Sequence, residues 1–423
     1  MSRYKPYLAY RDSGVEWISE VPDHWNVKRL RHVSTFTNSG IDKKSYEGQE
    51  QVGLCNYTDV YYNDFISADM PFMRATASKD EIAQFTLKKG DLIITKDSED
   101  PSDIGIPALV VEDAPGVVCG YHLTLIRSAE LATARFLHRV LQSTPTRAYF
   151  FIESPGITRY GLGQDVIGDL RVCMPPINEI HKIAECIDQE TARIDALIAK
   201  KARFIELLKD KRQALIAHAV TKGLDPDVKM RNSGVEWLGD VPEHWDVAIL
   251  KRFVVFQRGH DLPVDVRVEG KVPVVSSAGY SGTHNVAIAK SPGIVTGRYG
   301  SLGEFTFVQE DYWPLNTALY TIDLYNNEPR FIWYLLQNIS DLFLLHSAKA
   351  AVPGIDRNDI HEIYVAAPMP HEQKQISNYL DFQLDRINKV LIKTQRSIAL
   401  LKERRSAFIT AAVTGQIDLR EPA

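Results

Sequence analysis

RDSGVEWISEVPDHWNVKRLR, residues 11–31, and RNSGVEWLGDVPEHWDVAILK, residues 231–251, are two versions of one sequence. Aligned without gaps, they are identical at 12 of 21 positions, at an offset of 220. Both contain Ser-Gly-Val-Glu-Trp followed by Val-Pro and His-Trp, so we expect both copies to fold in the same way. The chain therefore carries an internal repeat, and this repeat decides its architecture.

A second pair of related segments lies further along the chain, at a different spacing. LLKDKRQALIAHAVT (207–221) and LLKERRSAFITAAVT (400–414) are identical at nine of their fifteen positions, at an offset of 193. The order is thus lead-in, variable block and helical segment, and then the same three parts again. Because the second offset is smaller by 27, the two blocks differ in length by that amount, and they share only short patterns. We interpret the lead-ins and helical segments as one repeated frame that carries two different variable blocks.

The helical segments predict two long, paired helices. Apolar residues recur at heptad spacing, as in Ile180, Ile187 and Ile194, and residues 178–220 and 371–413 contain neither Gly nor Pro. A single helix with such a stripe would leave it in water, so the two copies are expected to pack on each other. The first block leads directly into the start of the first helix, and the second lead-in and block follow directly at its end. Chain order therefore favours an antiparallel pair with an internal pseudo-two-fold axis.

The variable blocks, residues 30–172 and 250–366, predict mixed α/β domains. Short strand-like runs include DLIITK (91–96) and GIVTGR (293–298). A helical segment follows in each block, at ARFLHRVLQ (134–142) and PRFIWYLLQ (329–337). The predicted fold class is α/β, with two mixed α/β domains separated by two long antiparallel coiled-coil helices.

Composition favours a cytoplasmic globular protein. Of 423 residues, 44% are hydrophobic and 24% charged, and the net charge is −5. We expect neither a membrane span nor a signal peptide, because no apolar run is long enough. The four cysteines form no CxxC pair and are interpreted as reduced structural thiols. His24 and His244 recur beside tryptophans without a partner at metal-ligand spacing, so packing is the favoured role.

Several motifs in this order resemble one known family. Besides the lead-ins, they are KKGDLIITKDSEDPSDIGIPALV (88–110), TGRYGSLGEF (296–305), WPLNTALY (313–320) and AVPGIDRNDI (351–360), together with helices that open with Pro-Pro or Pro-x-Pro and Glu. Over essentially its whole length the chain resembles the DNA-specificity subunit of type I restriction–modification systems.

The resemblance implies a non-catalytic recognition subunit. Each block would be a target-recognition domain that contacts one half of a bipartite, asymmetric site on double-stranded DNA. The paired helices would set the spacing and dock adenine-methyltransferase modification subunits, with a restriction/translocase subunit as a further partner. S-adenosylmethionine and ATP would bind to those partners, and no cofactor to this chain. The implied domains are residues 1–173 (lead-in and first recognition domain), 174–222 (first spacer helix), 223–366 (lead-in and second recognition domain) and 367–423 (second spacer helix and C-terminal tail).

Candidate DNA contacts in the first block are basic or polar residues on predicted loops. Lys96 opens a loop whose carboxylates would repel phosphate but could accept from a cytosine amino group. For the residues just before the first long helix, helix-entry capping is the alternative. The candidates are Lys43, Lys44, Lys96, Arg159, Tyr160 and Gln164.

In the second block, the Gly-rich run at 296–305 would let backbone approach a ligand. The alternative is a tight hairpin that needs positive φ at Gly297, Gly300 or Gly303. Asn316 either reads adenine or caps a turn. The candidates are Arg258, Tyr280, His284, Arg298, Tyr299, Ser301, Asn316, Arg357 and Asn358.

Two rival functions remain at this point. Pro22-Asp23 with Asp42 and Lys44 loosely fits the PD…DxK pattern of a metal-dependent nuclease, and the blocks could instead grip proteins as a scaffold. The basic ends of both helices, including Arg404 and Arg405, are expected to stay solvated and to complement the helix dipole.

Overall fold

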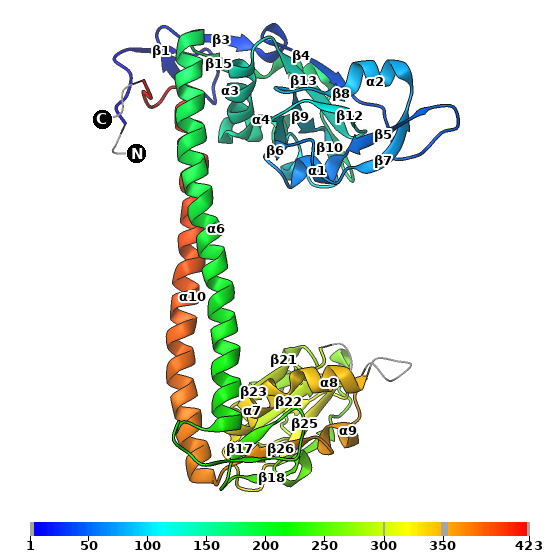
Figure 1. Ribbon diagram of the computed structural model, residues 1–423, viewed down its shortest axis with the longest axis vertical. Helices are drawn as coiled ribbons and strands as arrows, with labels where there is room; N and C mark the ends of the chain where they lie inside the picture. The colour runs from blue at the N-terminus through cyan, green and yellow to red at the C-terminus, as the bar shows by residue number, and fades with distance from the viewer. Residues whose placement is uncertain (1–3, 299–300, 348–353, 421–423) are drawn as a thin grey trace. The chain divides into compact units, whose positions relative to one another are not determined.

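The computed structural model describes residues 4–298, 301–347 and 354–420 (Figure 1). The chain divides into two compact units, Met1–Lys201 with Arg396–Ala423 and Ala202–Gln395. Both division points lie inside the long helices α6 (Ile177–Lys222) and α10 (Pro370–Val413). Each unit therefore combines one variable block with a part of each long helix.

The antiparallel course of the long helices is visible within each unit. In the first unit, the start of α6 lies beside the end of α10, where Arg404 and Arg405 pair with Glu190 and Asp195 at 3.4 and 2.9 Å. In the second unit, the end of α6 packs against the start of α10 through a shared apolar cluster that includes Ile216 and Ile376. The predicted antiparallel helix pair is confirmed in this sense.

The first block folds into two small sheets. One has the order β4-β13-β9-β11-β6 and the other β7-β5-β12-β8, with parallel pairs at β11·β6 and β12·β5. The strands are β4 (Ser34–Asn38), β5 (Glu50–Cys55), β6 (Phe65–Ile66), β7 (Met73–Ala77), β8 (Thr86–Leu87), β9 (Leu92–Thr95), β11 (Pro107–Val110), β12 (Ala114–Cys119) and β13 (Leu123–Ser128).

The central strand β9 contributes side chains to two apolar clusters, one shared with a helix and the other with the second sheet. Leu92 and Ile94 point to a cluster with Phe136 of α3 (Leu131–Gln142), whereas Ile93 joins a second cluster with Val118 of the other sheet. Successive side chains of a strand face opposite ways, so a strand buried on both faces has an unbroken apolar sequence. This is why DLIITK shows no polar alternation.

The second block uses the same plan with different lengths. Its sheets have the orders β19-β25-β22-β23 and β21-β20-β24, and Ile294 faces α7 (Pro329–Asn338) while Val295 faces the smaller sheet. The strands are β19 (Val255–Arg258), β20 (Val272–Ser276), β21 (Gly279–His284), β22 (Gly293–Gly297), β23 (Phe305–Val308), β24 (Trp313–Pro314) and β25 (Ala318–Asp323).

Each lead-in forms a small hairpin and then a strand that pairs with the strand entering the long helix. The hairpins are β1 (Tyr10–Asp12) with β2 (Glu20–Pro22) and β16 (Met230–Asn232) with β17 (Asp240–Pro242). The following pairs are β3 (Asn26–Arg29) with β15 (Arg171–Met174) and β18 (Asp246–Ile249) with β26 (Tyr364–Ala367).

Short helices complete both blocks. They are α1 (Tyr57–Tyr61), α2 (Lys79–Phe85), α4 (Thr144–Glu153), α5 (Gln164–Asp169), α8 (Ser340–Ser347) and α9 (Arg357–His361), together with the 3₁₀ turns η1 (Leu30–His32), η2 (Pro101–Asp103), η3 (Leu250–Arg252) and η4 (Val264–Val266). Within the described ranges, no helix has both the length and the apolar character to cross a membrane.

Candidate nucleic-acid interface

The lead-in of the first unit clamps the first turn of α6. The Trp25 indole Nε1–H donates to Glu179 Oε1 at 3.2 Å, and His24 Nε2 lies 2.8 Å from Glu179 Oε2. Tyr7 also donates to Oε1, and the Glu179 side chain is only 5% exposed. Burial and the neighbouring carboxylate raise the pKa of Tyr7, so this hydroxyl remains a donor at neutral pH.

The second unit repeats this clamp at the matching positions. Trp245 Nε1 donates to Glu372 Oε1 at 3.1 Å, and His244 Nε2 lies 2.8 Å from Oε2. The repeated histidines thus bind a carboxylate as well as pack. Among the described residues there is no group of three His, Cys, Asp or Glu side chains that could hold a metal ion.

A second repeated contact anchors the first block to α6. Figure 1 shows α3 beside α6, and Asp188 of α6 accepts from Arg135 and Arg139 of α3. The Arg139 side chain is 2% exposed, and its Nε and Nη2 contact Asp188 Oδ1 at 3.0 and 2.7 Å. A buried guanidinium needs such a partner, because an unpaired charge in the interior is costly.

The second block uses the position of α10 that matches Asp188 in the repeat. Asp381 of α10 accepts from the Tyr334 hydroxyl at 2.5 Å and pairs with Arg330 at 3.3 Å, both on α7. Arg330 replaces Arg135, and Tyr334 replaces Arg139. The anchor is therefore repeated, but only the first unit buries a charge in it.

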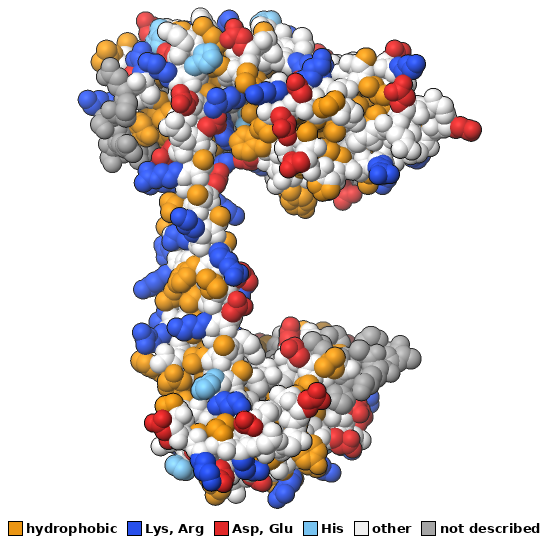
Figure 2. Space-filling model, viewed as in Figure 1, with side chains coloured by type: hydrophobic (Ala, Val, Ile, Leu, Met, Phe, Trp, Pro, Cys, Tyr) orange, Lys and Arg blue, Asp and Glu red, His pale blue; other side chains and the backbone are white. Residues whose placement is uncertain are grey.

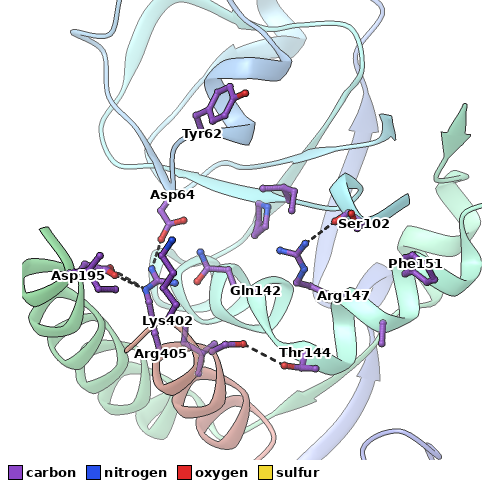
Figure 3. Close-up of a pocket in the computed structure, with 16 residues that line it drawn as sticks. Tyr62, Asp64, Ser102, Gln142, Thr144, Arg147, Phe151, Asp195, Lys402 and Arg405 are labelled. Carbon is purple, nitrogen blue, oxygen red and sulfur yellow. Dashed lines mark hydrogen bonds and ion pairs between the residues drawn. The ribbon is translucent and has the colours of Figure 1, made fainter. Parts of the chain in front are cut away.

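The first unit adds a further connection between its block and α10, shown in Figure 3. Arg405 of α10 donates to Asp64 of the block and, through Nε, pairs with Asp195 of α6 at 2.9 Å. Arg405 is 19% exposed, so the prediction that the basic helix end stays solvated is wrong for this residue. The contact borders a cavity of about 1010 Å³, in which Arg147 Nη2 donates to the Ser102 carbonyl at 2.8 Å.

Two titratable groups beside this contact are strongly influenced by burial. Burial lowers the pKa of His138, and the adjacent Arg139 lowers it further. Burial would raise the pKa of Asp64, but the positive charges of Arg405 and Arg139 outweigh it and hold that pKa below its ordinary value. At neutral pH the cluster therefore holds an ionised Asp64 and a neutral His138.

Three of the predicted contacts in the first block come together on one face. The short strands β10 (Asp97–Ser98) and β14 (Tyr160–Gly161) pair, which brings the loop after Lys96 beside Arg159 and Tyr160. Arg159 Nη2 lies 3.3 Å from Asp97 Oδ1, and its side chain is 60% exposed. Lys96 is 16% exposed and lies over the Tyr121 ring at 4.8 Å, so most of its ammonium is turned to the protein.

Sequence reasoning missed the rest of this face. His122 Nδ1 lies 2.5 Å from Asp97 Oδ1 and 2.9 Å from Arg159 Nη2. Tyr57 and Tyr61 of α1 stack at 5.6 Å and border, with these residues, a hollow of about 570 Å³. The sequence signal available for this part of the site was an aromatic cluster around residue 60, but no polar motif accompanies it.

The remaining candidates of the first block lie on two other segments. Gln164 is the exposed first residue of α5. Lys43 and Lys44 are exposed on the loop between β4 and β5. On the same loop, Asp42 accepts from the Lys44 amide at 2.8 Å and from the Tyr46 hydroxyl at 3.1 Å. These bonds use the carboxylate that the nuclease alternative required.

In the second block, Arg258 and Asn316 lie on neighbouring strand ends. Arg258 Nε donates to the Asn316 carbonyl at 3.4 Å, and the Asn316 side chain donates to Asp261. Both contacts join Asn316 to the segment at 258–261, so they are not the local turn cap that the alternative predicted. These contacts use its amide nitrogen and its backbone oxygen, whereas its carboxamide oxygen is the acceptor that it can offer to a ligand.

His284 does not reach the surface, whereas Tyr280 does. His284 is 7% exposed, its Nδ1 accepts from the Val268 amide at 3.1 Å, and its ring packs on Trp313. This placement argues against His284 as a DNA contact, because its ring completes the core and satisfies a backbone amide. Tyr280 is 62% exposed on β21 and can contact a ligand.

Among the described glycines of the Gly-rich run, Gly303 has the positive φ that the hairpin alternative needs. Gly303 has φ +77°, and a Cβ on Gly297 would lie 2.4 Å from the Ser301 carbonyl oxygen. Arg298 directly follows β22 and its amide donates to the Thr317 carbonyl at 2.9 Å, whereas Ser301 is half-buried. Tyr299 and Gly300 lie outside the described residues.

Arg357 and Asn358 occupy the start of α9. Asp356 caps this helix by accepting from the Asn358 amide at 2.8 Å. The side chains of Arg357 and Asn358 are exposed. Arg357 is the first residue of α9, as Gln164 is of α5, so the two candidates hold matching places in the repeated frame.

The long helices also present apolar side chains to solvent. Figure 2 shows hydrophobic side chains interspersed with Lys and Arg along both helices. Those with more than 40% exposure include Leu197, Phe204, Leu207, Phe382, Ile392 and Leu400. Such side chains on a rigid helix are typical of a protein-docking surface.

Comparison with known proteins points to one class. The family model described as type I restriction modification DNA specificity domain matches residues 242–401. The EcoDI type I restriction enzyme specificity subunit of Escherichia coli is 28% identical over 98 residues, which are 23% of this chain and 22% of that protein. The match thus spans about a fifth of the curated relative's length.

Solved structures extend the likeness of the fold to almost the whole chain. A chain from a structure on complex assembly and conformational transition of the type I R-M system has a TM-score of 0.70 at 14% identity and covers 94% of this chain and 99% of its own. The HsdS subunit of Thermoanaerobacter tengcongensis has a TM-score of 0.52 at 15% identity, with 94% and 98% covered.

Residues 242–401 therefore match the type I restriction modification DNA specificity domain. Over almost its whole length the chain has the fold of the solved type I R-M chain and of the HsdS subunit.

Proposed function

We propose that this chain reads a bipartite, asymmetric DNA site and directs methyltransferase and restriction subunits to it. The observation that carries the proposal is the combination of a repeated frame with unlike contents. Glu179 and Glu372 are clamped in the same way, and Asp188 and Asp381 anchor equivalent helices. The blocks that these contacts hold in place, however, differ in length and in side chains, as recognition of two different half-sites requires.

The proposed role of the chain is recognition without catalysis. Each block supplies side chains that reach base edges, while basic residues on phosphates fix the register. The exposed apolar side chains of the long helices support docking of the adenine-methyltransferase subunits. S-adenosylmethionine and ATP are then needed only on the methyltransferase and restriction/translocase partners.

Exchange of one block tests the proposal. Residues 30–172 are replaced by the corresponding block of another specificity subunit, and the modified motif is determined in cells that also express the methyltransferase. We expect one half of the motif to change and the other half to be retained. Binding of the methyltransferase complex to its DNA should also weaken as salt rises, because phosphate contacts release counterions. A motif that changes in both halves, or salt-independent binding, contradicts the proposal.

A further inference from the structure

We propose that Arg159 reads a guanine in the first half-site, with Asp97 and His122 as its positioning residues. The inference rests on the proposed function and adds to it a named base and the side chain that selects it. Guanine offers two acceptors, O6 and N7, on its major-groove edge, and the guanidinium fork matches both at once. An arginine that is held in place before DNA arrives makes this contact at a lower entropic cost.

The hydrogen bonds of Arg159 differ from those of the structural arginines in the same unit. Arg127 and Arg139 use Nε, Nη1 and Nη2 to bind protein acceptors, and Arg139 is 2% exposed. The contacts that the described residues make to Arg159 all go through Nη2. With 60% of its side chain exposed, Arg159 has the N–H groups of Nε and Nη1 available for a ligand, and either of them forms a fork toward guanine together with the second N–H of Nη2.

The anchor of Arg159 is a carboxylate that is itself fixed. Asp97 is 18% exposed and binds His122 Nδ1 at 2.5 Å as well as Arg159 Nη2 at 3.3 Å. In one tautomer of His122 the ring nitrogen Nδ1 donates to Asp97, and in the other it accepts from Arg159. Asp97 can accept from Arg159 in both cases. His122 has φ +72°, which non-glycine residues adopt at an energetic cost.

The backbone that carries Arg159 is equally constrained. Gly156 and Tyr160 form a β-bridge across a short loop, and a Cβ on Gly156 would lie 2.2 Å from the Arg159 carbonyl oxygen. Tyr160 then pairs with Ser98 in the β10–β14 ladder. The loop is therefore closed on both sides, and it presents Arg159 at one fixed place.

The charge around Arg159 favours a base over a phosphate. The same hollow is bordered by Glu99, Asp100 and Asp103. These carboxylates repel a phosphate group, whereas they do not repel the neutral edge of a base pair. Tyr57 and Tyr61 also border the hollow and offer apolar contact to that base pair.

Substitution at position 159 tests the assignment in the complete methyltransferase complex. We expect Arg159→Ala and Arg159→Lys to make one guanine position of the first half-site degenerate, with roughly 5- to 150-fold less discrimination there. The other positions of that half and the whole second half should be retained. Asp97→Asn should affect the same position more weakly. Arg74→Ala, an exposed arginine on β7 of the same unit, is the control and should leave the motif unchanged.

A modified base tests the contact without changing the protein. Duplexes with 7-deazaguanine at that position lack the N7 acceptor and should bind wild-type complex more weakly, while Arg159→Ala shows no further loss. The inference is overturned if Arg159→Lys keeps the wild-type motif, if Arg159→Ala lowers methylation evenly at all positions, or if 7-deazaguanine has no effect on the wild type. A wild-type complex without any interrupted motif would instead refute the proposed function itself.

Discussion

The Trp25 indole and the Glu179 carboxylate, 154 positions apart in sequence, meet at 3.2 Å and join the lead-in to the first turn of α6. The same contact joins Trp245 to Glu372 at 3.1 Å. Because the Glu follows the variable block in both cases, the contact closes the frame around whatever that block contains. A block can therefore change in length and content without disturbing its mount.

Removal of the clamp carboxylate should destabilise the first unit more than the second. In Glu179→Ala, Trp25, Tyr7 and His24 lose a partner that is 5% exposed, whereas Glu372 is 22% exposed and has two such donors. We expect a loss of about 2–3 kcal/mol for Glu179→Ala and about 1 kcal/mol for Glu372→Ala. Chemical denaturation of both variants measures the difference, and equal losses would contradict the described contacts.

The two domain anchors should respond differently to the same neutral substitution. Asp188→Asn takes away the carboxylate that binds Nε and Nη2 of the buried Arg139 and leaves Asp64, 4.0 Å away, as its counter-charge, which should cost about 3 kcal/mol. Asp381→Asn still accepts from Tyr334 and loses only a partly exposed ion pair with Arg330, which costs about 1 kcal/mol or less. Thermal unfolding of each variant checks this order. A larger effect at Asp381 would show that the repeated anchor is mis-assigned.

Arg405 and Arg404 form a matched pair on α10 for testing the contact in Figure 3. Arg405→Met removes a 19% exposed guanidinium from two carboxylates and should lower stability by about 1–3 kcal/mol. Arg404→Met removes an ion pair to Glu190 whose arginine is 64% exposed, and should cost at most about 1 kcal/mol. Indistinguishable unfolding transitions of the two variants would rule out the bridging role of Arg405.

His138 should make stability depend on pH in the mildly acidic range. Its folded-state pKa lies below the ordinary value of about 6.5, so the unfolded chain takes up a proton that the folded chain does not. Stability should therefore fall as pH drops below about 6.5, by up to about 1.4 kcal/mol per pH unit from this group. His138→Gln should flatten the unfolding free energy between pH 6.5 and 5. Parallel curves for wild type and variant would show that His138 does not titrate in this way.

Asp64 influences stability at lower pH than His138 does. Its stabilising form is the deprotonated, ionised carboxylate. Its lowered pKa means that its contribution is present above the ordinary carboxyl pKa and is lost as pH falls through the folded value. The two groups should therefore be separable by pH, His138 first and Asp64 in more acidic solution.

Much of the fold was predictable because it depends on periodicity and repetition. The Gly- and Pro-free stretches predicted α6 and α10, and the apolar runs at 91–96 and 293–298 predicted β9 and β22. The two-fold use of Glu179 and Glu372 was also present in the repeat, but a charged residue at a helix start is usually interpreted as a dipole partner. Its burial under Trp25 is a tertiary effect that no local pattern contains.

The candidate site was less predictable because it is assembled from distant residues. Asp97, His122 and Arg159 belong to three separate loops, and only the β10–β14 pairing brings them together. His284 shows the reverse case, since its polar side chain suggested an exposed contact while its ring completes a core against Trp313. The structural role of Arg405 likewise depends on Asp64, which belongs to the first block and is far from Arg405 in sequence.

The central claim is that one frame carries two different DNA readers. Methylome sequencing of cells that express this chain with its methyltransferase tests it most directly. We expect modified bases at a two-part, interrupted motif whose halves have different sequences. A single continuous palindrome, or no modified motif above that of cells without the chain, would contradict it.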